Sequence, residues 1–133
     1  MIRLFGVVLI ATAFFSIANA QENLSSVALK SGESKVIGRA SYFTPPPGCR
    51  SLLAALGNID ILQGDPEVAL AIRTQSVTPP QCGAKKVDGG VVIATAGNIE
   101  HSHSGKLIYR IHYKTFGGAD IVWSYRLDVN LEP

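Results

Sequence analysis

The stretch LIYRIHYKTFGGADIVWSYRLDVNL, residues 107–131, alternates apolar and polar side chains on both sides of a glycine pair. A period of two residues is typical of a β-strand with one buried face and one wet face. Gly117 and Gly118 supply the backbone freedom that a tight turn requires. The stretch therefore predicts two antiparallel strands, because so short a link cannot make a parallel crossover. The apolar face is expected to carry Leu107, Tyr109, Ile111, Tyr113, Ile121, Trp123, Tyr125, Leu127, Val129 and Leu131.

A lone hairpin is only marginally stable in water, so this apolar face must pack against other elements. Further segments with strand-like composition are separated by clusters of Gly, Pro, Asn and Ser: 27–30, 35–43, 58–62, 67–74 and 91–95. Together with the hairpin they make about seven strands, which is typical of a β-sandwich. Only residues 51–57 favour a helix, with Ser51 as its N-cap and Gly57 as its stop.

Residues 1–20 have the three parts of a secretory signal peptide. Arg3 supplies the positive start, residues 4–17 form an uncharged apolar run, and Ala18-Asn19-Ala20 is a small-x-small cleavage site. The run is shorter than the roughly 20 residues that a membrane-spanning helix needs. We therefore expect cleavage after Ala20, one domain over residues 21–133, and a secreted or periplasmic location.

The two cysteines, Cys49 and Cys82, are expected to form a disulfide because an exported chain folds in an oxidising compartment. Closing the loop between them would stabilise the fold by roughly 3 to 4 kcal/mol on the chain-entropy model. A proline run precedes each cysteine, at residues 45–47 and at Pro79-Pro80, and stiffens the chain that leads to it.

The charge balance excludes some classes of partner. The chain has 12 Lys and Arg against 10 Asp and Glu, and removal of Arg3 with the signal peptide leaves 11 against 10. A nucleic-acid-binding protein needs a clustered basic face, and the only adjacent basic pair is Lys85-Lys86. We therefore predict no nucleic-acid partner. Apart from residues 4–17, no apolar stretch approaches the length of a membrane span, so no span is predicted in the mature chain.

The segment from Tyr109 to Asp128 resembles the C-terminal signature of bacterial cadherin-like and immunoglobulin-like modules. Phe116, Gly118 and Asp120 match its Phe-x-Gly-x-Asp spacing, and Trp123-Ser124-Tyr125 matches the aromatic, small residue and tyrosine that follow. The resemblance implies an immunoglobulin-like sandwich outside the cytoplasm with an adhesive or structural role. It also implies that Phe116 fills the core and that Asp120 braces the turn. It brings no catalytic residues.

Histidines offer an alternative function. His101 and His103 lie two residues apart, so in an extended chain both rings would point to one side, as chelation of Cu or Zn requires. His112 lies on the polar face of the next strand and could come near them through a hairpin-like approach. A metal site needs three or four ligands. The competing interpretation is a solvated loop with incidental histidines.

Two further surfaces could act as binding sites. The aromatics of the hairpin's apolar face could form a platform for sugar rings, but core packing explains them more simply. The proline-stiffened loop over residues 77–90 carries Lys85 and Lys86, and a rigid basic loop could enter an acidic cleft as an enzyme inhibitor does. A plain surface connection between two strands is the competing interpretation of this loop.

The sequence thus predicts an all-β protein, a single immunoglobulin-like β-sandwich with one disulfide, exported and acting as a structural, adhesive or protein-binding module. Its partner would be a protein or another component of the envelope, and no cofactor is predicted. No G-x-S-x-G elbow is present and both cysteines are expected to pair, so we predict that the protein is not an enzyme. A Cu- or Zn-binding protein and an exported inhibitor remain the alternatives.

Overall fold

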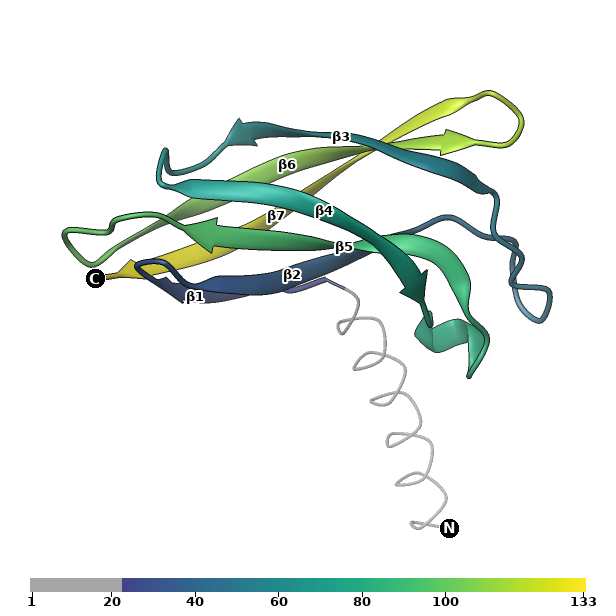
Figure 1. The fold of residues 1–133 in the computed structure, drawn as a ribbon, viewed down its shortest axis with the longest axis horizontal. Coiled ribbons are helices and arrows are strands. Elements are labelled where there is room, and N and C mark those ends of the chain that lie inside the picture. The colour runs from purple at the N-terminus through teal and green to yellow at the C-terminus, as the bar shows by residue number, and fades with distance from the viewer. Residues whose placement is uncertain (1–22) are drawn as a thin grey trace, which may run out of the picture.

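Seven strands make up most of residues 23–133, the part of the chain that the computed structural model describes (Figure 1). The predicted signal peptide lies outside these residues. A single 3-10 turn over Pro80–Cys82 is the remaining regular element of the described residues. The strands are β1 (Ser26–Lys30), β2 (Ser34–Ser41), β3 (Leu53–Gln63), β4 (Val68–Val77), β5 (Val87–Ala96), β6 (His103–Thr115) and β7 (Asp120–Glu132).

The strands form two sheets that pack face to face as an open sandwich (Figure 1). One sheet has the order β1-β7-β6-β3 and the other has the order β2-β5-β4. The pairing of β1 with β7 is parallel and all other neighbours are antiparallel. The predicted all-β sandwich of seven strands is therefore confirmed. The strands that flank the turns at 31–33 and 64–67 belong to different sheets, so these turns are corners between the layers and not hairpins.

The predicted hairpin is confirmed as β6 and β7, which pair from Lys114 opposite Asp120 to His103 opposite Leu131. Gly118 adopts a φ of +85° in the turn. The turn is braced by Thr115, whose backbone N–H donates to the carbonyl of Ala119 over 3.0 Å and whose hydroxyl accepts the N–H of Ala119 over 3.2 Å.

The roles that the resemblance implied for Phe116 and Asp120 are wrong. Phe116 follows the last residue of β6 in the turn, and 71% of its surface is exposed. Asp120 is the first residue of β7, and its carboxylate faces His112 across the sheet instead of the turn backbone.

The core lies between the sheets and is built around the apolar face of the hairpin. Seven hairpin side chains are buried: Leu107, Tyr109, Ile111, Tyr113, Leu127, Val129 and Leu131. The other sheet covers them with Ile37 of β2 and with Val92 and Ala94 of β5. Burial of this apolar area is the main term that favours folding.

The predicted helix over residues 51–57 is wrong, because most of this segment belongs to β3. Its residues pair with β6, with Leu53 opposite Thr115 and Leu56 opposite Tyr113. Leu53 is buried, and Leu56 packs against the core. Local helix propensity in so short a segment is weak, and pairing with the long strand β6 outweighs it.

The predicted strand over residues 91–95 is confirmed but longer, because β5 begins at Val87 and includes Gly89 and Gly90. The structure explains this glycine pair by close backbone approach. A Cβ atom on Gly89 would lie 2.3 Å from the carbonyl oxygen of Ala40 in β2, and one on Gly90 would lie 2.9 Å from that of Arg73 in β4. These glycines let the central strand fit between its two neighbours.

The disulfide between Cys49 and Cys82 is confirmed, with a Cα–Cα distance of 6.0 Å. It joins the connector between β2 and β3 to the connector between β4 and β5. These connectors come from one end of the sandwich, so the bond ties together two loops that leave different strands. Within residues 23–133 no helix has the length and apolar character needed to cross a membrane.

Replacing Gly89 by alanine should destabilise the protein, because the new methyl group has no room against the backbone of β2. We expect Gly89→Ala to lower the free energy of unfolding by about 1 to 3 kcal/mol in urea denaturation. Gly105→Ala is the matched control, since a Cβ there meets nothing within 4 Å, and it should change stability by no more than about 0.5 kcal/mol. Equal effects of the two substitutions would contradict this account of β5.

Removal of the disulfide by the double substitution Cys49→Ser and Cys82→Ser should also destabilise the protein. The bond closes a loop with a sequence separation of 33 residues. Its loss should lower the free energy of unfolding by about 3 kcal/mol, because the unfolded chain regains the entropy of the open loop. Urea denaturation of the oxidised protein and of the double variant measures the difference. A change below about 1 kcal/mol would mean that the connectors hold each other without it.

Candidate functional site

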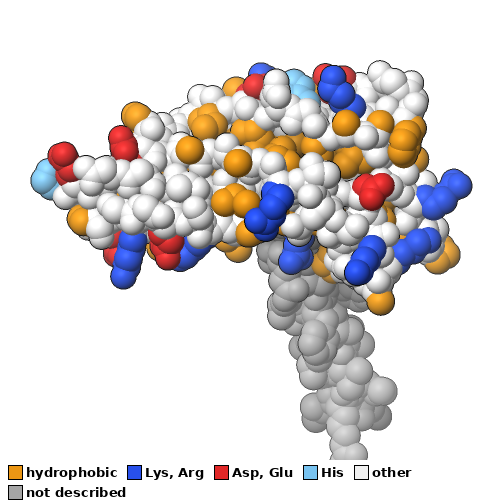
Figure 2. Space-filling model, viewed as in Figure 1, with side chains coloured by type: hydrophobic (Ala, Val, Ile, Leu, Met, Phe, Trp, Pro, Cys, Tyr) orange, Lys and Arg blue, Asp and Glu red, His pale blue; other side chains and the backbone are white. Residues whose placement is uncertain are grey.

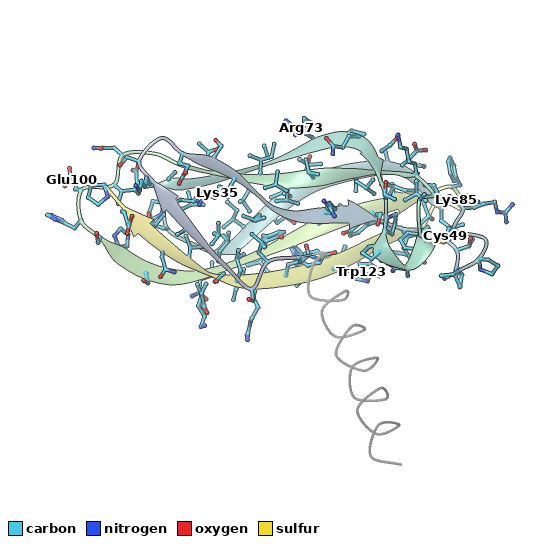
Figure 3. The ribbon with its side chains drawn as sticks, turned by 90° about the horizontal axis from the view of Figure 1, so that it is seen from below. Lys35, Cys49, Arg73, Lys85, Glu100 and Trp123 are labelled. Atoms are coloured by element: carbon cyan, nitrogen blue, oxygen red, sulfur yellow. A yellow bond between two sulfur atoms is a disulfide. The ribbon has the colours of Figure 1, made fainter. Side chains whose placement is uncertain are left out.

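A cavity of about 450 Å³ opens at the disulfide end of the sandwich, between β7 and β2. Its walls come from the first half of β7, the end of β2, and the two connectors that the disulfide joins. We call it the aromatic cleft, because Tyr42, Phe43, Tyr113, Trp123 and Tyr125 line it. In Figure 3, Trp123 lies toward the end of the molecule that also carries Cys49 and Lys85.

The cleft exists because the two halves of β7 have different neighbours. The second half, residues 128–132, pairs with β1. After β1 the chain turns into β2 in the other sheet, so the edge of the sandwich is covered along this half of β7. Among the described residues no strand flanks the first half in this way. Trp123 shares a face with the buried Leu127 and Val129, yet 45% of its surface is exposed.

The aromatic side chains of the cleft hold one another in place. The Trp123 ring meets Tyr42 edge-on at a centroid distance of 5.9 Å and lies tilted against Tyr113 at 5.2 Å. The hydroxyl groups of Tyr113 and Tyr125 are 2.5 Å apart and hydrogen-bonded. Aromatic contacts of this geometry stabilise beyond their buried area. The indole is therefore fixed in orientation while almost half of it faces solvent.

The polar side chains of the cleft are Asn23, Arg39, Ser41 and Gln81, which add amide, hydroxyl and guanidinium groups. Arg39 is exposed, and its guanidinium has no carboxylate partner among residues 23–133. The described residues that line the cleft include no Asp, Glu or His. The cleft thus combines an apolar platform with hydrogen-bonding groups and one unpaired positive charge.

The expectation that the hairpin aromatics pack in the core is confirmed for Tyr109 and Tyr113 and wrong for Trp123. Tyr109 and Tyr113 are buried, and burial raises the pKa of the Tyr109 phenol far above its ordinary value. Tyr125 is half-buried and stacks on Tyr109. Trp123 belongs to the cleft. Sequence reasoning missed Tyr42, which contacts Trp123, and Arg39, which lines the same cleft, because only the packing of the two sheets brings these residues together.

The predicted basic loop over residues 77–90 is shorter in the structure, since β4 extends to Val77 and β5 begins at Val87. Lys85 and Lys86 are both exposed in the connector. The ammonium group of Lys85 donates a hydrogen bond of 2.6 Å to the carbonyl of Gly48, so this lysine also ties the two disulfide-linked connectors together. An inhibitory role of this loop stays a prediction.

The three histidines do not come together. His103 and His112 lie nine residues apart on β6, roughly 30 Å at the rise of an antiparallel strand. The expectation that His112 approaches the other two is therefore wrong, because one continuous strand separates them. Among residues 23–133, no three His, Cys, Asp or Glu side chains are placed to hold a metal ion. Metal binding at His101 and His103 stays a prediction without structural support.

His103 is held by two acceptors. Its Nδ1 lies 2.7 Å from the carbonyl oxygen of His101, and its Nε2 lies 2.7 Å from a carboxylate oxygen of Asp65. Two acceptors require both ring nitrogens to donate, which favours the protonated ring. The carbonyl of His101 and the carboxylate of Asp65 accordingly raise the pKa of His103. A ring bonded in this way offers no lone pair to a metal.

His112 lies in a similar cluster on the outer face of the four-stranded sheet. Its Nε2 is 2.8 Å from Asp60 on β3, and its Nδ1 is 3.4 Å from Asp120 on β7. Arg110 also donates to Asp60, over 3.2 Å. These contacts raise the pKa of His112, chiefly through Asp60, and lower the pKa of Asp60, chiefly through His112 and then through Arg110.

The cluster around His112 is a set of partly exposed ion pairs. The register of β3 on β6 places Asp60 beside Arg110 and His112. Both nitrogens of the imidazole are engaged, one by Asp60 and the other by Asp120. Exposed pairs of this kind contribute little to stability.

The His112 cluster generates a prediction about titration. The interaction of Asp60 with His112 is complete between the ordinary pKa of aspartate, 3.8, and that of histidine, 6.5. It is lost as pH rises through the raised pKa of His112 or falls through the lowered pKa of Asp60. In an NMR titration, Asp60→Asn should lower the pKa of His112 toward 6.5. The pKa of His103, which bonds to Asp65, should not move, and an unchanged pKa of His112 would contradict the pairing.

Comparison of the chain with models of protein families, with curated proteins and with solved structures finds no match. The candidate site therefore has to be judged on its own geometry. Of the surfaces described, the aromatic cleft alone combines a defined volume, a fixed and accessible aromatic ring, and an unpaired charge.

Proposed function

We propose that this protein is an exported, non-catalytic binding module of immunoglobulin-like architecture that holds a component of the cell envelope in its aromatic cleft. The observation that carries the proposal is the half-exposed Trp123, fixed between Tyr42 and Tyr113 in a cavity of about 450 Å³. Ligand sites typically have such volumes, an apolar lining and a few convergent polar groups.

The strand order supports the immunoglobulin-like part of the proposal. If the seven strands are lettered A to G along the chain, the sheets read A-G-F-C and B-E-D. Immunoglobulin sandwiches of the constant type have the sheets A-B-E-D and C-F-G. The difference is that the first strand here pairs with the last. The disulfide also differs, since it joins two connectors at one end instead of linking strands B and F across the core.

Export is supported by the sequence of residues 1–20 and by the disulfide. Structural disulfides form and persist in oxidising compartments such as the periplasm and the extracellular space. Cys49 and Cys82 are the only cysteines of the chain, and both are used in this bond. The bond therefore agrees with the location that the predicted signal peptide implies.

A binding role without catalysis is supported by the side chains of the cleft. Acid–base and nucleophilic catalysis need a titrating or activated group within reach of the substrate. The described lining of the cleft offers aromatic rings, prolines, amides, hydroxyls and one arginine. Such groups suit the binding and orientation of a ligand, and the described lining lacks the carboxylates and imidazoles that most often act as general bases.

The disulfide and the prolines favour binding by holding the cleft in one shape. Pro45, Pro46, Pro79 and Pro80 all line the cleft, and they stand in the two connectors that the disulfide joins. Proline fixes φ, and a cross-link limits the motion of both loops. A site that is already ordered loses less conformational entropy when its ligand binds.

The proposal is tested by retention of envelope material on immobilised residues 21–133 with the disulfide intact. The protein is incubated with the solubilised proteins and polysaccharides of the envelope of the cell that exports it. Trp123→Ala should retain at least about tenfold less of the bound component than the unaltered chain, because buried aromatic anchors dominate binding energy.

Phe116→Ala is the matched control, since it removes an exposed aromatic ring that lies outside the cleft, and it should retain as much as the unaltered chain. Trp123→Phe keeps an aromatic ring and should retain an intermediate amount, which separates loss of the platform from loss of the fold. Equal retention by Trp123→Ala, or no retained component at all, would refute the proposed function.

A further inference from the structure

We infer that the ligand of the aromatic cleft is an acidic sugar, a uronic-acid residue whose ring lies on Trp123 and whose carboxylate pairs with Arg39. The inference rests on the proposed function, because it names the class of ligand for the same cleft. It follows from three properties of the cleft that one ligand must satisfy together: an exposed aromatic side chain, a set of groups that both donate and accept hydrogen bonds, and a cation that has no carboxylate partner among residues 23–133.

The first property is the solvent-exposed surface of Trp123. Contacts with Tyr42 and Tyr113 fix the indole, and 45% of its surface is left to solvent. The face of an indole carries a partial negative charge, and it attracts the weakly positive C–H groups on the flat side of a sugar ring. Because the ring is already fixed, little rotamer entropy is lost when a ligand stacks on it.

The second property is the chemistry of the polar lining. Asn23 and Gln81 carry amides and Ser41 carries a hydroxyl, and each of these groups both donates and accepts hydrogen bonds. A sugar hydroxyl also donates and accepts, so groups of this kind can satisfy it in either direction. A purely apolar ligand would leave these side chains without partners, at a cost in free energy.

The third property is the charge. Arg39 lines the cleft without a carboxylate partner among the described residues. A guanidinium binds a carboxylate in a fork geometry that is stronger than a neutral hydrogen bond. Among the residues that the structure describes, the lining includes no acidic side chain that would repel an anion.

The distribution of charged residues along the molecule also favours an anionic ligand. The connectors at the cleft end carry Arg50, Lys85 and Lys86, and Figure 2 shows several Lys and Arg side chains gathered at the right-hand end. Asp88 is an acidic residue near this end. The turns at the opposite end carry acidic residues: Glu33, Asp65, Glu67 and Glu100. The basic residues of these connectors favour the approach of an anion to the cleft end.

The test uses the single tryptophan of the chain, since Trp123 alone reports its surroundings in fluorescence. Residues 21–133 with the disulfide intact are titrated with a galacturonate tetramer and with a mannuronate tetramer. At least one tetramer should change the emission of Trp123 with saturation. The fully methyl-esterified galacturonate tetramer keeps the rings and hydroxyls but loses the charges, so it should bind at least about tenfold more weakly than the free acid.

Two arginine variants separate a specific pair from general attraction. Arg39→Gln should lower the affinity for the acidic tetramer at least about tenfold and should leave the affinity for the ester unchanged. Arg126→Gln removes an exposed cation of β7 that does not line the cleft, and it should leave both affinities close to those of the unaltered chain. An equal loss in the two variants would overturn the assignment of Arg39.

Other outcomes overturn the inference in distinguishable ways. Equal binding of acid and ester would make the ligand a neutral sugar. Equal binding of a penta-aspartate peptide would make the cleft a site for acidic peptides. If neither tetramer changes the emission at millimolar concentration while envelope material is still retained through Trp123, the inference falls and the proposed function stands. If retention through Trp123 is absent as well, both fall.

Discussion

The structure depends on the cross-strand pairing of β6 with β7. The two strands form a continuous ladder of residue pairs from Lys114 opposite Asp120 to His103 opposite Leu131. The ladder presents one apolar face, which β2 and β5 cover, and two edges, to which β3 and β1 attach. A shift of one residue in this register would turn the apolar face of one strand toward solvent. The alternation that fixes the register therefore also fixes the position of the core.

The sequence predicts the elements better than it predicts their surroundings. The hairpin could be predicted because alternation and a glycine turn are local signals. The disulfide could be predicted because the chain has two cysteines and a predicted signal peptide, which leaves one possible pairing. The segment over residues 51–57 could not be predicted, because its pairing with β6 is a distant contact that outweighs its helical composition. The extension of β5 through Gly89 and Gly90 is also a distant effect, since it is the close approach of β2 and β4 that requires glycine there.

In the candidate site, too, local features could be predicted from the sequence and distant contacts could not. Periodicity correctly places Trp123 on the apolar face of β7, and it cannot show that β1 flanks only the second half of that strand. The exposure of Trp123 and the approach of Tyr42 and Arg39 follow from that partial cover. The histidines attract attention in the sequence because their side chains are chemically versatile. In the structure both ring nitrogens of His103 and of His112 contact acceptors, so these side chains form local ion pairs and hydrogen bonds.

The parallel pairing of β1 with β7 has a mechanical consequence. Five residue pairs, from Ser26 opposite Asp128 to Lys30 opposite Glu132, join the first strand to the last. Tension applied to the chain before Ser26 and after Glu132 pulls these parallel strands in opposite directions along their shared axis. The hydrogen bonds between them then bear the force together in shear, and they do not open one after another as the bonds of a pulled hairpin do. A module with this arrangement resists stretching at the point where a load would enter it.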